Sequence, residues 1–172
     1  MNTKIELLNR ELGALEFNSR VLAQAEDNKT PLLERLRFIG IVSSNMDEFF
    51  EIRMAGIKEQ LLINPIKMGS DGRTITASYD LVSQHAHALV DRQYELYQQI
   101  LIPQLRKAGI EFLLPANWTH EQQVWAEDFF KEELLPLLTP IALDPVHPFP
   151  RVINKSLNFI VQLDGKDAFG RK

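Results

Sequence analysis

The chain of 172 residues contains no cysteine. This absence excludes a disulfide framework, a thiolate zinc site and cysteine-based nucleophilic catalysis. No apolar run approaches the ~20 residues that cross a bilayer, and the first residues, MNTKIELLNRELG, lack the continuous apolar core of a signal peptide. We therefore expect a cytoplasmic protein without a transmembrane segment, and association with a membrane surface stays open.

An excess of basic charge is also missing, because 19 lysines and arginines face 23 aspartates and glutamates and the net charge is −4. A negative balance argues against general affinity for nucleic acids, so no nucleic-acid partner is expected. No glycine-rich phosphate loop of the Walker or dinucleotide-binding type is present. The remaining composition, 45% hydrophobic and 24% charged, is that of a globular protein with a core.

Helical periodicity dominates the first part of the chain. A first helix is expected from about Asn9, a candidate N-cap, to Glu26. A second helix is expected to begin with Thr30 as the N-cap and Pro31 at the first helical position, where a missing N–H costs nothing.

Residues 43–45, Ser-Ser-Asn, interrupt this second helix with side chains that are unfavourable in helix interiors. Asn45 followed by Asp47 and Glu48 resembles a capping box, which would begin a new helix at that point. Apolar residues nevertheless continue at helical spacing across the interruption, at Ile39, Val42, Met46 and Phe49. We therefore favour one long helix that is distorted near the polar residues.

A loop and a third helical stretch come next. Residues 64–73, NPIKMGSDGR, predict irregular structure. A long amphipathic helix with a bundle-type seam is predicted by Tyr79, Val82, Ala86, Leu89, Gln93, Leu96 and Ile100. Pro103 should kink this helix or shift its hydrogen bonds, and Gly109 is a candidate for the C-terminal cap.

The pattern changes after residue 108. Residues 110–114 predict a short strand, Thr119–Gln122 form a capping box that opens a helix ending before Pro136, and alternation over residues 157–163 predicts a second strand. Two strands cannot form a stable sheet unaided. We expect a mainly α protein, with an antiparallel helical bundle at residues 1–108 and the incomplete start of a mixed α/β head domain at residues 109–172.

No group of residues predicts a complete catalytic or metal site. His85 and His87 are two residues apart on a helix and face different directions, so they are not a ligand pair. The acids at Asp47, Glu48 and Glu51 lack the Glu-x-x-His motifs of carboxylate metal sites in bundles. The sequence predicts no catalytic residue and no metal ligand.

Two asparagines lie beside the apolar stripes. The planar amide of Asn45 carries a donor and an acceptor, which matches the edge of a purine base, although capping or packing is the commoner role of such a residue. Asn18 predicts a satisfied hydrogen bond between helices. The scattered helix arginines are expected to be solvated or ion-paired: Arg20, Arg35, Arg37 and Arg53.

Three stretches resemble a known family. They are RELGALEFNSRVLAQA, TPLLERLRFIGIVSSNMDEFFEIRMAGIKEQ and LLPLLTPIALDPVHPFPRVINKSLNF, and they lie in order between about Glu11 and Leu163. Together they resemble the amino-terminal region of polyphosphate kinase, the large bacterial family that is phosphorylated on histidine. The block SSNMDEFF and the loop DPVHPFP are the most specific parts of this resemblance.

The resemblance implies a full-length enzyme that reversibly transfers the terminal phosphate of ATP to polyphosphate with Mg²⁺, and that forms homo-oligomers. It implies a helical amino-terminal domain, a head domain, and two carboxy-terminal domains that hold the phosphorylated histidine and the Mg²⁺ ligands. The expected partners are ATP or ADP, polyphosphate and those catalytic domains. This fragment alone is expected to be inactive, and none of its histidines is assigned as the phosphorylated one: His85, His87, His120 and His147.

One binding residue follows from the resemblance. The family supplies an asparagine near the adenine of ATP from the motif matched here by residues 44–48, which implies that Asn45 binds ATP. The alternative is a non-catalytic helical module for protein–protein interaction. In that alternative the seam from Tyr79 to Ile100 binds a partner helix and Asn45 is only a cap.

Overall fold

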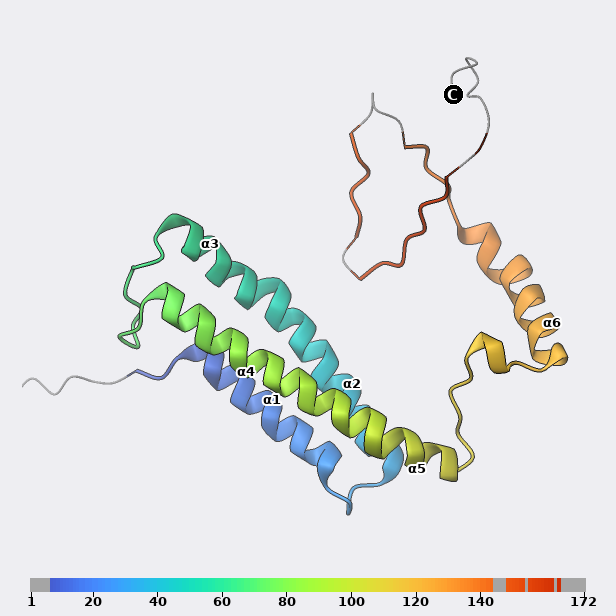
Figure 1. Cartoon of the computed structure of the whole chain (residues 1–172), viewed down its shortest axis with the longest axis horizontal. Helices are drawn as coiled ribbons and strands as arrows, with labels where there is room; N and C mark the ends of the chain where they lie inside the picture. The colour runs from blue at the N-terminus through green and yellow to red at the C-terminus, as the bar shows by residue number, and fades with distance from the viewer. Residues whose placement is uncertain (1–6, 144–147, 154, 163, 165–172) are drawn as a thin grey trace, which may run out of the picture. The chain divides into compact units, whose positions relative to one another are not determined.

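The computed structural model describes residues 7–143, 148–153, 155–162 and 164. The described residues are mainly helical, which confirms the predicted fold class (Figure 1). The chain divides into two compact units, Met1–Phe112 and Leu113–Lys172. The predicted domain boundary between residues 108 and 109 stays a prediction.

The first helix, α1, spans Arg10–Glu26. Asn9 is its N-cap, as predicted, because the side-chain oxygen of Asn9 accepts hydrogen bonds from the backbone N–H groups of Glu11 and Leu12, both at 3.0 Å. The cap satisfies two of the amides that a helix start leaves without partners.

The second helical stretch is continuous through the polar residues 43–45. It consists of α2 (Leu32–Glu48), a π-helical turn η1 (Phe49–Met54) and α3 (Ala55–Ile63), and it forms one rod in Figure 1. The prediction of one long helix is confirmed, and the distortion follows the polar residues. The capping-box alternative is wrong, because Asn45 lies inside α2.

The start of α2 differs from the prediction by one residue. Pro31 is extended, with ψ near 143°, so Pro31 rather than Thr30 is the N-cap residue. No side chain caps this helix start, and the carbonyl of Pro31 accepts the first intrahelical bond, from the N–H of Arg35 at 2.9 Å.

The third stretch consists of α4 (Ile75–Glu95), a π-helical turn η2 (Leu96–Leu101) and α5 (Ile102–Lys107). The shift of hydrogen bonding expected near Pro103 is present as η2, since proline cannot donate to the carbonyl four residues earlier. Gly109, with φ +82°, caps the end as predicted. The N–H of Gly109 donates to Arg106 at 3.0 Å and that of Ile110 to Leu105 at 2.9 Å, which is a Schellman motif.

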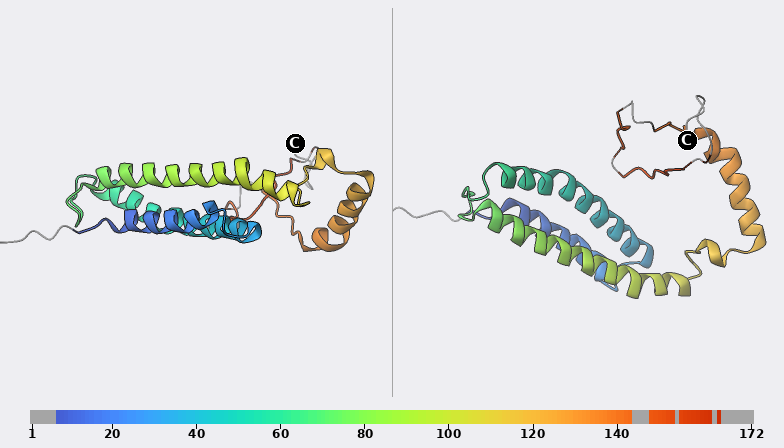
Figure 2. Two further views of the ribbon diagram at one scale, coloured as in Figure 1. Left: turned by 90° about the horizontal axis from the view of Figure 1, so that it is seen from below. Right: turned by 45° about the horizontal axis from the view of Figure 1, so that its top comes forward.

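These three stretches pack side by side and antiparallel to form the bundle of the first unit (Figures 1 and 2). Their apolar faces form one core, made of Leu15, Leu22, Ala25, Ile39, Val42, Met46, Phe49, Met54, Val82, Ala86, Leu89, Leu96 and Leu101. The predicted seam is therefore buried, with one correction. Ile100 is 43% exposed and Leu101 is 0% exposed, because the wider turns of η2 move the buried position along by one residue.

Two buried polar side chains connect the helices. Arg35 of α2 is only 4% exposed; its Nε donates to the carbonyl of Ala25 at 2.6 Å and its Nη1 to Oε1 of Gln104 at 2.8 Å. Gln93 of α4 donates through Nε2 to the carbonyl of Ile39, at 3.0 Å. The expectation that Arg35 is solvated or ion-paired is wrong, because carbonyl oxygens at the negative carboxyl end of α1 and on a glutamine satisfy it.

The loop between α3 and α4 is fastened to the start of α1. It contains a single isolated β-bridge between Met68 and Thr74. The carboxylate of Asp71 accepts a hydrogen bond from Nδ2 of Asn9 at 2.9 Å and forms an ion pair with Arg73 at 3.2 Å. The hydrogen bond from Asn9 lowers the pKa of Asp71 below its ordinary value, and Arg73 lowers it further. Asn9 therefore both caps α1 and holds the loop.

The second unit contains helix and no strand among its described residues. A 3₁₀ turn η3 (Pro115–Asn117) precedes α6 (His120–Phe129), which begins with the predicted capping box. The π-helical turn η4 (Phe130–Leu134) and the 3₁₀ turn η5 (Leu135–Leu137) continue it.

Both predicted strands are wrong for the described part of the chain. Residues 110–114 and 157–162 form no β-ladder, and Leu163 lies outside the described residues. A strand needs a neighbour for its backbone hydrogen bonds, and none lies beside these segments in the part of the chain that the structure covers. None of the described residues of the second unit is buried, so no core holds these segments together.

Replacing Arg35 by methionine should lower the free energy of unfolding by about 1–3 kcal/mol, because the oxygens of Ala25 and Gln104 lose their donors. Arg37→Met is the matched control on the same helix. Arg37 is 73% exposed at its side chain and pairs with Glu34 at 3.7 Å, so its loss should cost no more than about 0.5 kcal/mol. Urea unfolding followed by circular dichroism measures both, and equal losses would contradict the role of Arg35.

The bundle should lose stability in acid partly through Asp71. Its pKa is lowered in the folded state from an ordinary value of 3.8, so its contribution is present above that pH and is lost as the pH falls through the lower folded value. Asp71→Asn should therefore show a shallower fall in unfolding free energy than the parent chain between about pH 5 and pH 3. Parallel curves for the two proteins in urea titrations over this range would refute the assignment.

Candidate functional site

The residue predicted to bind ATP, Asn45, lies near the end of α2, just before the π-helical turn η1. It is half-buried, and its side chain faces α1. Its Nδ2 donates a hydrogen bond to Oδ1 of Asn18 at 2.8 Å. Among the described residues, Oδ1 of Asn45 has no hydrogen-bond partner, so the amide presents one unused acceptor.

Asn18 is the buried member of this pair. Its side chain is 5% exposed, and its Nδ2 donates to the backbone carbonyl of Ala14, one turn earlier on α1, at 3.0 Å. The predicted hydrogen bond between helices at Asn18 is confirmed. The sequence analysis did not pair Asn18 with Asn45, because spacing along each helix does not give the register between two helices.

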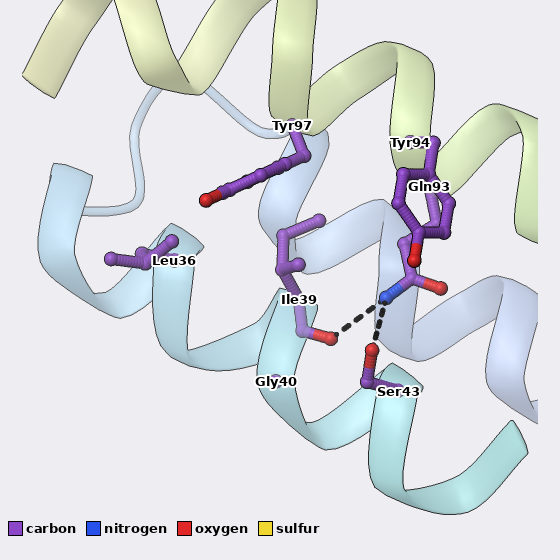
Figure 3. A pocket seen from close by; sticks show the side chains of 7 residues that line it. All are labelled: Leu36, Ile39, Gly40, Ser43, Gln93, Tyr94 and Tyr97. Carbon is purple, nitrogen blue, oxygen red and sulfur yellow. Dashed lines mark hydrogen bonds between the residues drawn. The ribbon is translucent and has the colours of Figure 1, made fainter. Parts of the chain in front are cut away.

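A pocket of about 370 Å³ lies on another face of α2, between α2 and the helix that faces it (Figure 3). It is lined by Leu36, Ile39, Gly40, Ser43, Gln93, Tyr94 and Tyr97. Of the polar residues 43–45, it contains Ser43 and not Asn45. The structure therefore does not bring the predicted ATP-binding residue into this pocket.

The polar groups of the pocket are already paired. Nε2 of Gln93 donates both to the carbonyl of Ile39 and to Oγ of Ser43, each at 3.0 Å (Figure 3). This contact explains why Ser43 is tolerated in the middle of α2. Sequence reasoning missed Tyr94 and Tyr97, because they flank the seam of α4 and η2 rather than form it.

Charged and metal-binding groups were also placed. In the described part of the chain, no group of three or more His, Cys, Asp or Glu side chains lies close enough together to hold a metal ion. His85 and His87 are exposed, and Nδ1 of each donates to a carbonyl one turn earlier, Leu81 at 2.8 Å and Ser83 at 2.7 Å.

Arg53 departs from the expectation for exposed helix arginines. It lies in η1, and its Nη1 is buried without a hydrogen-bond partner among the described residues. No described helix has both the length and the apolar character needed to span a membrane.

Two protein-family models match the chain. One describes the polyphosphate kinase N-terminal domain and matches residues 7–113, which is more than half of the chain. The other describes the polyphosphate kinase middle domain and matches residues 121–172. The chain belongs to the polyphosphate kinase family.

Individual relatives agree with this assignment. A polyphosphate kinase from Burkholderia cenocepacia (strain HI2424) is 57% identical over all 172 residues, and one from Paraburkholderia phytofirmans is 56% identical over the same length. The chain spans 25% of the length of these relatives. It therefore corresponds to a fragment of such a kinase, from its amino-terminal region.

A solved structure from the same family has the same fold. The crystal structure of polyphosphate kinase from Porphyromonas gingivalis matches with a TM-score of 0.68 and 25% sequence identity. The match covers 87% of this chain and 21% of that chain. Fold and sequence thus lead to the same polyphosphate kinase family, although neither identifies a ligand at Asn45.

Proposed function

We propose that this chain is the amino-terminal part of a cytoplasmic ATP:polyphosphate phosphotransferase, and that Asn45 contacts the adenine of ATP. The full-length enzyme would transfer the terminal phosphate of ATP reversibly to polyphosphate. The observation that carries the proposal for Asn45 is its half-buried amide, whose Oδ1 is unpaired within the described chain although the residue lies inside a helix. A capping role, the usual alternative, does not apply there.

An adenine contact would act through binding and orientation. Phosphoryl transfer depends mainly on positioning and on stabilising charge, and holding the base places the terminal phosphate for attack. An amide suits this task, because its acceptor and donor match the N6 amino group and the N1 atom of adenine. The bond-making histidine and the Mg²⁺ ligands are proposed to lie in the carboxy-terminal domains, and no ligand of Mg²⁺ is assigned to this chain.

Exposed apolar side chains support a role within a larger assembly. Several large ones lie on helices of both units, at Phe17, Ile41, Ile52, Trp125, Phe129 and Leu134. Clusters of exposed apolar surface mark contact regions. We propose that these surfaces meet the catalytic domains of the same enzyme or another copy in a homo-oligomer.

The alternative of an interaction module receives less support. It requires the seam of the third helical stretch to be free for a partner helix. In the bundle, Val82, Ala86 and Leu89 of that seam are buried against the chain's own helices. A partner helix would therefore have to displace α1 or α2.

Asn45→Ala in the full-length kinase should lower kcat/KM for ATP by roughly two- to tenfold, mainly through a higher KM, because about one neutral hydrogen bond to the base is lost. Initial rates of polyphosphate synthesis at varied ATP concentration measure this effect. Asn28→Ala is the control, since Asn28 is an exposed asparagine in the turn between α1 and α2. Unchanged ATP kinetics in the folded Asn45→Ala enzyme would refute the proposal.

The chain of 172 residues alone should be inactive. Incubation with ATP carrying a labelled terminal phosphate and Mg²⁺ should give neither polyphosphate nor labelled protein. The reason is that the proposed phosphate acceptor and metal ligands belong to other domains. Label on the purified chain, stable to removal of nucleotide, would overturn this assignment, and the full-length kinase serves as the positive control.

A further inference from the structure

The hydrogen bonds from Ala14 to Asn45 run in one direction only. A backbone carbonyl only accepts, so the group of Asn18 that faces the carbonyl of Ala14 must be its Nδ2. Oδ1 of Asn18 then faces Asn45, and because this oxygen also only accepts, Asn45 must present Nδ2 to it. The backbone of α1 thereby determines which way the amide of Asn45 points.

We propose that Asn18 is a positioning residue that fixes the orientation of the Asn45 amide and so makes the enzyme prefer a 6-amino purine nucleotide over a 6-oxo purine nucleotide. This inference rests on the proposed contact between Asn45 and the base. Asn18 itself is too deeply buried to touch a nucleotide.

The preference follows from the groups that remain on Asn45. One hydrogen of Nδ2 is used by Asn18, which leaves the second hydrogen and Oδ1. Adenine offers a donor at N6 and an acceptor at N1, so it pairs with this amide as it stands. Hypoxanthine reverses both groups, with an acceptor at O6 and a donor at N1, and pairs only with an amide turned by 180°.

Turning the amide is unfavourable while Asn18 is present. It would place Oδ1 of Asn45 against Oδ1 of Asn18, so that two acceptors face each other and the hydrogen bond is lost. Asn18 cannot turn in response, because its own oxygen would then face the carbonyl of Ala14. The buried position of Asn18 keeps water from replacing the lost partner.

The test compares ATP with inosine triphosphate in the full-length kinase, as the ratio of their kcat/KM values. Asn18→Leu removes the acceptor, frees the amide of Asn45 to turn, and should reduce the ATP preference roughly two- to tenfold, the effect of about one neutral hydrogen bond. Asn18→Asp keeps an acceptor toward Asn45, whether the carboxyl is ionised or protonated, and should retain the parent ratio.

Gln93→Leu is the matched control for general damage to the bundle. Gln93 is another buried amide that connects two helices, and it does not contact Asn45. This control should lower stability without changing the nucleotide ratio. Circular dichroism confirms folding of each variant, and if Asn18→Leu does not fold, Asn18→Ser replaces it, because a hydroxyl can donate or accept and leaves the amide free to turn.

The outcomes separate this inference from the proposed function. A reduced ratio in the Asn18→Leu or Asn18→Ser enzyme, with the parent ratio in Asn18→Asp and Gln93→Leu, supports the positioning role. An unchanged ratio in the removal variant, or an equal reduction in Gln93→Leu, overturns it even if Asn45→Ala weakens ATP use. If Asn45→Ala leaves ATP kinetics unchanged, the proposed base contact fails, and this inference fails with it.

Discussion

A polar side chain buried between helices is tolerated only when its donors and acceptors find partners, and this constraint determines how the bundle is assembled. Arg35 meets it with the carbonyl of Ala25 and with Gln104, and Gln93 meets it with Ile39 and Ser43. Apolar contacts alone tolerate sliding of one helix along another, whereas these bonds are directional. We infer that they set the register in which the apolar faces meet.

The π-helical turns work with the same register. In the second stretch, Met46 and Phe49 are buried before or at η1, and the next buried residue is Met54. In the third stretch, Leu96 is followed by Leu101 rather than Ile100. Each π turn adds a residue to the repeat, which rotates the following helix and returns its apolar side to the core. Without that rotation, the long helices would turn their apolar faces away from one another.

The sequence predicts the helices well because capping and periodicity are local. Asn9, Thr119 and Gly109 act at their own helix ends, and each does what its residue type predicts. Predictions fail where a distant partner decides the outcome. Arg35 is paired by residues far along the chain, and residues 110–114 and 157–162 form no strand because no described segment lies beside them. The pairing of Asn18 with Asn45 is of the same kind, since only the packed bundle brings them together.

The polar residues 43–45 illustrate how one short segment serves two neighbours. Ser43 lies on the face of α2 toward α4 and accepts a bond from Gln93, whereas Asn45 lies toward α1 and donates to Asn18. For Ser43 this accounts for a residue that is unfavourable in a helix interior. For Asn45 it accounts for one amide hydrogen and leaves the oxygen unused, so packing explains only half of the side chain. An amide kept in place by a buried partner, with its other half unpaired, is suited to bind a ligand whose pocket is completed by other parts of the kinase.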